Sequence, residues 1–162
     1  MEPMTPALKP RYVILVILFV AAATIAAAWA FQVIGGYAPC PLCLQQRWPY
    51  YAIIPIAIVL LWTSGREKLV RAGLLLIALI MFAGAALAVY HAGIEWRWWQ
   101  GPQACSGGAG LTGTLPDLSN LSVVRCDEAA LRILGLSLAG WNALISLLIA
   151  GLALAAARRR SA

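Results

Sequence analysis

Two closely spaced cysteines, in the stretch Pro39-Cys40-Pro41-Leu42-Cys43, are the residues of this sequence best suited to redox chemistry. A proline supplies the backbone φ of a first helical residue and loses no hydrogen bond there, so Pro41 predicts a helix with Cys40 at its N-cap and Cys43 in its first turn. Unpaired N–H groups and the positive end of the helix dipole favour a thiolate at such a position. The motif therefore predicts a reactive dithiol.

Arg47 follows Cys43 by four positions. On one continuous helix the two side chains would share a face, and the guanidinium would lie beside the reaction partner of the thiolate. An arginine near the end of a membrane helix can also extend to the lipid headgroups without any role in chemistry. The spacing alone leaves both roles open.

The other two cysteines, Cys105 and Cys126, lie far from this motif and far from each other. Four cysteines are enough for a zinc site, but such sites use two closely spaced pairs, and the second close pair is missing. The Cys40 and Cys43 pair is thus favoured as a redox dithiol over an inert disulfide or a metal site. The glycine-rich run 106–114 predicts a mobile loop, and a disulfide across it would be exchangeable.

Composition places these residues in a membrane protein, because 62% of the chain is hydrophobic and only 11% is charged. A span of the hydrocarbon core takes about 20 helical residues. Four runs reach that length: Tyr12 to Ile34, Pro41 to Thr63, Leu69 to Tyr90 and Ile133 to Ala157. We therefore expect an all-α integral membrane four-helix bundle, one domain over 1–162, with helices at about 12–34, 41–63, 69–90 and 133–157 and one long loop, 91–132.

Two of these runs have irregular features. The first follows basic residues as a signal peptide would, but its apolar core is too long for one, so we expect an uncleaved helix. The second contains Pro55, which should kink it.

The basic residues predict the orientation of the bundle. With four spans both termini share one side, and most of the chain's 12 lysines and arginines would lie there, at Lys9, Arg11, Arg66, Lys68, Arg71, Arg158, Arg159 and Arg160. Positive charge near helix ends marks the cytoplasmic side. All four cysteines then face the opposite compartment, where disulfides persist. The net charge of +6 thus requires no nucleic acid as a partner.

Several residues around the long loop have two interpretations or a weaker signal. His91 is either an interfacial hydrogen-bonding residue or a group that touches a cofactor or moves protons. Asn142, inside the last apolar run, either bonds a neighbouring helix or contacts a ligand.

The stretch 95–99, rich in tryptophan, predicts an interfacial anchor. A short helix on the membrane is expected at 115–124, and the acidic pair 127–128 is expected in the first turn of a helix that leads into the fourth span.

An ordered set of motifs resembles the DsbB family of bacterial disulfide-bond formation proteins over nearly the whole chain. The motifs are Cys-Pro-Leu-Cys-Leu-Gln-Gln-Arg at 40–47, Tyr-His-Ala-Gly at 90–93, a second cysteine pair in the single long outer loop, and Cys-Asp-Glu at 126–128 before Gly-Leu-Ser-Leu-Ala-Gly-Trp-Asn at 135–142. Their combination and order make the resemblance specific.

The resemblance implies an inner-membrane thiol oxidoreductase that reoxidises a periplasmic, DsbA-like protein of the thioredoxin type and passes two electrons to a membrane quinone, either ubiquinone or menaquinone. In this family pattern Cys105 forms the mixed disulfide with the partner and Cys126 resolves it. Cys40 exchanges with the loop pair, Cys43 meets the quinone, and Arg47 supports quinone binding. No metal is implied.

Three other functions are compatible with the residues alone. One is an oxidase of the same type dedicated to a single substrate protein. Another is a non-enzymatic four-helix membrane protein whose disulfides only fasten the outer loop. The third is a metal-binding membrane module, which would lose its fold on chelation.

The charge asymmetry generates a topology prediction. After reduction, a thiol reagent that does not cross membranes should label Cys105 or Cys126 from the periplasmic face of intact cells. The reason is that the positive-inside pattern places both cysteines on the periplasmic side. Labelling is measured by mass spectrometry on the isolated protein. Reaction only in inverted vesicles would overturn the orientation.

Overall fold

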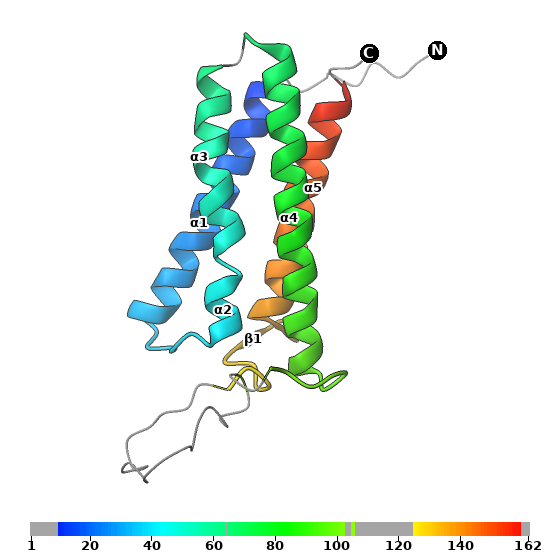
Figure 1. Cartoon of the computed structure of the whole chain (residues 1–162). Helices are drawn as coiled ribbons and strands as arrows, with labels where there is room; N and C mark the ends of the chain where they lie inside the picture. The colour runs from blue at the N-terminus through cyan, green and yellow to red at the C-terminus, as the bar shows by residue number, and fades with distance from the viewer. Residues whose placement is uncertain (1–9, 64, 103–104, 106–124, 160–162) are drawn as a thin grey trace, which may run out of the picture.

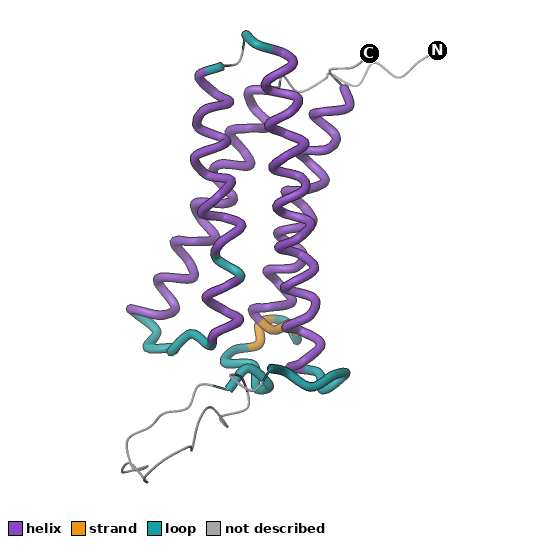
Figure 2. Tube along the Cα trace, in the orientation of Figure 1, coloured by secondary structure: helices purple, strands orange, loops and turns teal. Residues whose placement is uncertain are grey.

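The structure is a computed structural model, and it describes residues 10–63, 65–102, 105 and 125–159. Its helices run alongside one another in a bundle, which confirms the predicted all-α class (Figures 1 and 2). The elements in chain order are α1 (Pro10–Val33), α2 (Pro41–Gln45), α3 (Trp48–Trp62), α4 (Glu67–Glu95), β1 (Arg132–Ile133), β2 (Leu136–Ser137) and α5 (Leu138–Arg159). The predicted glycine-rich loop 106–114 and helix 115–124 lie outside the described residues.

Three helices, α1, α4 and α5, are long and apolar enough to cross a membrane, so the chain is a membrane protein. The second expected span differs from its prediction. Instead of one helix over 41–63, the chain forms α2 and α3, with a turn at Gln46 and Arg47 between them. Pro49 explains the break, because it has no N–H to donate to the carbonyl of Gln45 and its ring would crowd that carbonyl. Pro55, by contrast, lies inside α3 without ending it.

The boundaries around the long loop also differ from the predictions. α4 continues beyond the expected end at residue 90 to Glu95, so His91 lies within a helix. The acidic pair 127–128 does not begin a helix, because α5 starts only at Leu138. A short antiparallel hairpin of β1 and β2 precedes it, and its turn contains Gly135 at φ +82°, a conformation that glycine adopts without strain.

Large apolar side chains fill the centre of the bundle. Every spanning helix and α3 contribute, and buried members include Ile14, Ile17, Tyr50, Ile53, Leu74, Ile77, Met81 and Ile149. Other large apolar side chains, such as Phe19, Trp62 and Leu79, are exposed on the outside, as expected where lipid surrounds the helices. A second buried cluster lies apart from this core and contains Cys40, Leu42, Ile94, Cys105 and Cys126. It lies around the start of α2, at the end of the bundle opposite to the turn between α3 and α4 (Figure 1).

The close contact of α3 with α4 generates a prediction about stability. A Cβ on Gly84 would lie 2.9 Å from Cγ of Pro49, whose ring cannot turn away. Gly84→Ala should therefore lower the free energy of unfolding by about 1–3 kcal/mol. The matched control is Gly151→Ala, which meets nothing within 4 Å and should stabilise α5 by up to about 1 kcal/mol. Unfolding in micelles, followed by circular dichroism, tests both. Equal changes in the two variants would contradict the packing.

Candidate active site

Cys40 and Cys43 begin α2 in the predicted arrangement. Cys40 is the N-cap, Pro41 follows it, and the Cys40 sulfur accepts the backbone N–H of Cys43 at 3.1 Å. The hydrogen bond with the Cys43 side chain raises the pKa of the Cys40 thiol, and burial acts in the same direction. Backbone N–H groups lower it, as the sequence suggested, but theirs is the smaller effect. The same hydrogen bond lowers the pKa of Cys43, so within this pair the expected thiolate is favoured on Cys43 and not on Cys40.

The second cysteine pair lies directly beside the first. Cys105 and Cys126 form a disulfide with a Cα–Cα distance of 4.9 Å, and each is 1% exposed. The Cys40 and Cys126 sulfurs and a ring nitrogen of His91 all lie within 4.8 Å of one another. Segments distant in the sequence thus place a disulfide sulfur next to a free thiol. This proximity is what thiol–disulfide exchange requires.

The same three groups are also residue types that bind metals. A cysteine binds a metal as a thiolate. Here the Cys126 sulfur is already bonded to Cys105, so the arrangement offers only two free ligands from these three residues. It therefore favours sulfur exchange over the metal-binding module that the sequence left open.

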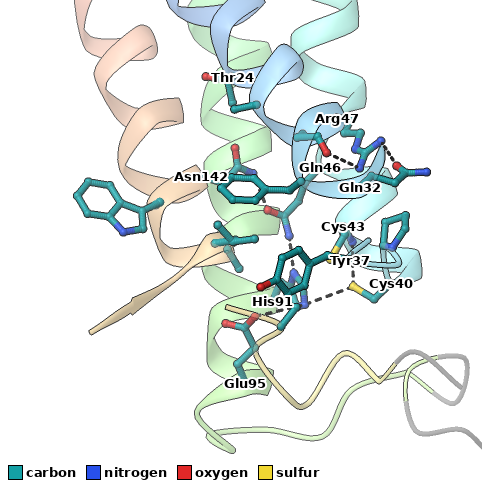
Figure 3. A pocket seen from close by; sticks show the side chains of 18 of the residues that line it. Thr24, Gln32, Tyr37, Cys40, Cys43, Gln46, Arg47, His91, Glu95 and Asn142 are labelled. Carbon is teal, nitrogen blue, oxygen red and sulfur yellow. Dashed lines mark hydrogen bonds and ion pairs between the residues drawn. The ribbon is translucent and has the colours of Figure 1, made fainter. Parts of the chain in front are cut away.

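His91 is buried at 3% exposure and makes its polar contacts within the protein. Its Nε2 lies 3.7 Å from the Cys40 sulfur and 3.9 Å from Oε1 of Glu95, and its Nδ1 lies 2.6 Å from Nε2 of Gln46 (Figure 3). Sequence reasoning did not select Gln46 or Glu95. Gln46 could have been found from its position, because it is a polar residue beside Arg47 in the motif and close to apolar spans.

Arg47 turns toward α1. It donates to Oε1 of Gln32 at 2.9 Å and to the carbonyl of Ala28 at 3.5 Å, and its guanidinium lies 5.3 Å from the centre of the Trp29 ring. At 8% exposure it is buried in the protein and does not extend to the headgroups. Cys43 and Arg47 do not share a helix, because α2 ends at Gln45, yet both line one cavity.

This cavity has a volume of about 320 Å³ and lies among α1, the α2–α3 turn and α5 (Figure 3). Its walls are largely apolar, and the polar groups at its surface include Gln32, Arg47, His91, Glu95 and Asn142. Such a volume suits a small organic ligand held by a few polar groups. Within the described residues, Oε2 of Glu95 is a buried side-chain oxygen without a hydrogen-bond partner.

Asn142 joins α5 to the α2–α3 segment, which is one of its two predicted roles. It donates from Nδ2 to Oε1 of Gln46 at 2.5 Å and accepts at Oδ1 from the Tyr50 hydroxyl at 2.6 Å. It also lines the cavity, so the second predicted role, contact with a ligand, is compatible with its position.

A polar pair and an aromatic stack lie at the same end of the bundle as the site. Arg125 donates to both carboxylate oxygens of Asp127, at 3.0 and 2.7 Å, and this hydrogen bonding lowers the pKa of Asp127. The acidic residue that was expected at a helix start thus pairs with its neighbour instead. Trp99 stacks on Tyr90 with ring centroids 6.0 Å apart, next to exposed Trp98. The residues of the predicted interfacial anchor thus lie at the C-terminal end of α4, where Trp98 is exposed.

The fold and the site together define a class: a membrane helix bundle with redox-active cysteines at one end. Comparison with known families makes this specific, since the model of the family "Disulfide bond formation protein DsbB" matches residues 10–156. The chain belongs to the DsbB family. Family membership supports a role in disulfide bond formation.

Individual relatives agree with this assignment. The chain is 28% identical over 163 aligned positions to Disulfide bond formation protein B of Albidiferax ferrireducens, covering 94% of this chain and 90% of the relative. It is 27% identical to the protein of the same name from a Polaromonas species, covering 87% and 86%. An uncharacterized protein of Rickettsia prowazekii is 28% identical, covering 86% and 84%. No solved structure matches significantly.

The contact between the two cysteine pairs predicts a cross-link. In a Cys43→Ser, Cys105→Ser variant, Cys40 and Cys126 should form a disulfide in most molecules under mild oxidation, because their sulfurs lie within 4.8 Å. The control variant Cys40→Ser, Cys126→Ser keeps the other two thiols and should cross-link less. Peptide mapping without reduction measures both yields. Equal yields would mean that the observed contact does not direct pairing.

Proposed function

We propose that this chain is an inner-membrane oxidoreductase that reoxidises a periplasmic dithiol protein of the thioredoxin type, similar to DsbA, and transfers the electrons to a membrane quinone. The observation that carries the proposal is the position of the Cys40 sulfur, which lies within 4.8 Å of the Cys126 sulfur and lines the apolar cavity. The two cysteine pairs and the cavity thus form one continuous site, and family membership supports the same activity.

The first exchange takes place at the outer pair. A thiolate of the partner attacks Cys105, a mixed disulfide forms, and Cys126 leaves as a thiolate. The second thiol of the partner then attacks the mixed disulfide and releases the oxidised partner. Cys105 and Cys126 are left reduced, and two electrons have moved from the partner into the loop pair.

The second exchange passes these electrons inward, starting from an oxidised Cys40–Cys43 pair. The Cys126 thiolate attacks Cys40, the bond between Cys40 and Cys43 breaks, and Cys43 leaves as a thiolate. Cys105 then attacks Cys126, which restores the loop disulfide and releases Cys40. The close contact of the Cys40 and Cys126 sulfurs suits this sequence, because exchange requires direct attack of one sulfur on another.

The cavity fits a quinone head group in shape and polarity. Its walls are largely apolar, while Arg47 and His91 provide hydrogen-bond donors and Cys43 provides the sulfur that must be reoxidised. A quinone bound there would supply the two-electron oxidising capacity, which no side chain has. Buried Arg47 would stabilise negative charge in this low-dielectric site more effectively than it could in water.

The orientation belongs to this proposal. α1 begins and α5 ends at the end of the bundle where the turn between α3 and α4 lies, and the site lies at the opposite end (Figure 1). Basic residues Arg66, Lys68 and Arg71 cluster at that turn. The positive-inside pattern thus favours cytoplasmic termini and a periplasmic site.

The proposed activity is tested by mixing purified, detergent-solubilised chain with a reduced thioredoxin-type dithiol protein and a soluble quinone analogue. We expect one quinone reduced for each dithiol oxidised, with turnover lost in Cys105→Ser. The Cys40 and Cys43 pair should remain oxidisable by quinone in that variant, because the two steps use different sulfurs. Thiol loss without quinone reduction, or near wild-type turnover in Cys105→Ser, would contradict the proposed electron path.

Arg47 provides the sharpest test of the cofactor site. Arg47→Ala should lower kcat/KM for quinone roughly ten- to a hundredfold, the effect of losing a charge-assisted hydrogen bond. Arg47→Lys should recover part of this, since lysine keeps the charge but not the planar fork that contacts Gln32 and Ala28. Arg71→Ala, at the opposite end of the bundle, is the control. Quinone saturation curves are normalised to folded protein, and identical curves for all variants would remove Arg47 from the site.

A further inference from the structure

A chain of hydrogen bonds runs from the Cys40 sulfur into the centre of the bundle. The Ser146 hydroxyl lies 3.0 Å from the Tyr50 hydroxyl, which donates to Asn142 Oδ1 at 2.6 Å. Asn142 Nδ2 donates to Gln46 Oε1 at 2.5 Å, and Gln46 Nε2 lies 2.6 Å from His91 Nδ1. Ser146, Tyr50, Gln46 and His91 are all buried. The chain joins α3, α5, the α2–α3 turn and α4.

The two amides give this chain a direction. Tyr50 donates to the oxygen of Asn142, so the amide nitrogen of Asn142 faces Gln46. Gln46 accepts that bond with its oxygen, and its own amide nitrogen must then face His91. An amide nitrogen only donates. Nδ1 of His91 is therefore an acceptor and carries no proton.

The other ring nitrogen of His91 faces groups that can accept. Its Nε2 lies 3.7 Å from the Cys40 sulfur and 3.9 Å from Oε1 of Glu95, and the ring also has a hydrogen-bonding contact with the backbone of Cys126. A neutral imidazole with an acceptor at Nδ1 carries its proton on Nε2. We infer that Gln46 is a positioning residue, which holds His91 in the Nε2–H form and directs this N–H at the Cys40 sulfur.

The consequence for the reaction rests on the proposed function. When Cys105 attacks Cys126 of a Cys40–Cys126 disulfide, that S–S bond breaks, the new bond forms between Cys105 and Cys126, and the electron pair goes to the Cys40 sulfur. An N–H aimed at this sulfur stabilises the departing thiolate, and a stabilised thiolate leaves faster. The reversed tautomer would instead present a lone pair to the sulfur and oppose its departure.

The protein's one histidine makes the tautomer directly measurable. The full chain, labelled with ¹⁵N-histidine and held in micelles at pH 8, gives ring ¹⁵N shifts that distinguish the two forms. Wild type should show the proton on Nε2. Gln46→Glu should move it to Nδ1, because a carboxylate only accepts.

Two further variants separate this positioning role from simple packing. Asn142→Asp does not touch His91, yet its carboxylate should make Gln46 turn its amide and present its oxygen to Nδ1, so the proton should again move. Ser146→Ala, at the far end of the chain, leaves the Tyr50 donor in place and should keep the wild-type tautomer. A wild-type proton on Nδ1, an imidazolium at pH 8, or no shift in either acidic variant would overturn the inference.

The kinetic measurement is the rate at which the Cys40–Cys126 disulfide disappears during a single turnover. Rapid alkylation and peptide mapping determine how much of it remains at each time. Gln46→Glu and Asn142→Asp should slow it roughly ten- to a hundredfold, the effect of losing a hydrogen bond to a charged group, while Ser146→Ala should not. Shifted tautomers with an unchanged resolution rate would overturn the role of Gln46 in exchange. Expected tautomers in a chain that lacks oxidase activity would instead refute the proposed function and leave the positioning of His91 intact.

Discussion

The start of α2 sets the arrangement of the whole site, because the Cys40 sulfur there contacts several other groups. The Cys40 sulfur accepts the N–H of Cys43 and so caps the helix, and it also faces His91 and Cys126. Pro49 ends the helix before Gln46, and the two turn residues then extend to opposite walls. Gln46 reaches α4 and α5, while Arg47 reaches α1. A single short helix thereby connects the Cys105–Cys126 disulfide, His91 and Arg47 around one cavity.

The low dielectric of the bundle explains why this site contains so many paired polar groups. A buried polar group without a partner destabilises the fold by about 1–3 kcal/mol, so hydrogen bonds accompany nearly every polar side chain at this depth. The described residues hold one clear exception, Oε2 of Glu95, which belongs to a residue of the cavity wall. Hydrogen bonds to Gln32 and Gln46 thus hold the guanidinium of Arg47 and the imidazole of His91 in place at the cavity wall.

Local signals in the sequence were enough for the features that depend on neighbouring residues. The N-cap at Cys40, the apolar spans and the family motifs follow from composition and short spacings. Contacts between distant segments could not be predicted this way. Gln46 contacts His91 and Asn142 only because three helices pack together. His91 is 45 positions from Gln46 in the sequence, and Asn142 is 96 positions from it. Pro49 was enough to predict the break after α2, but the long apolar run around it favoured one continuous helix. For the β hairpin before α5, the only local indication in the sequence was Gly135.

In the proposed reaction, electrons pass between the two cysteine pairs through a bond between Cys40 and Cys126. Wild-type protein can be mixed with a reduced thioredoxin-type dithiol protein and quinone, stopped with acid at millisecond intervals, alkylated and mapped for its disulfides. The amount of a Cys40–Cys126 disulfide should rise after partner oxidation begins and fall as quinone is reduced. Quinone reduction at full rate without this disulfide, with another cysteine pairing forming and decaying in its place, would contradict this electron path.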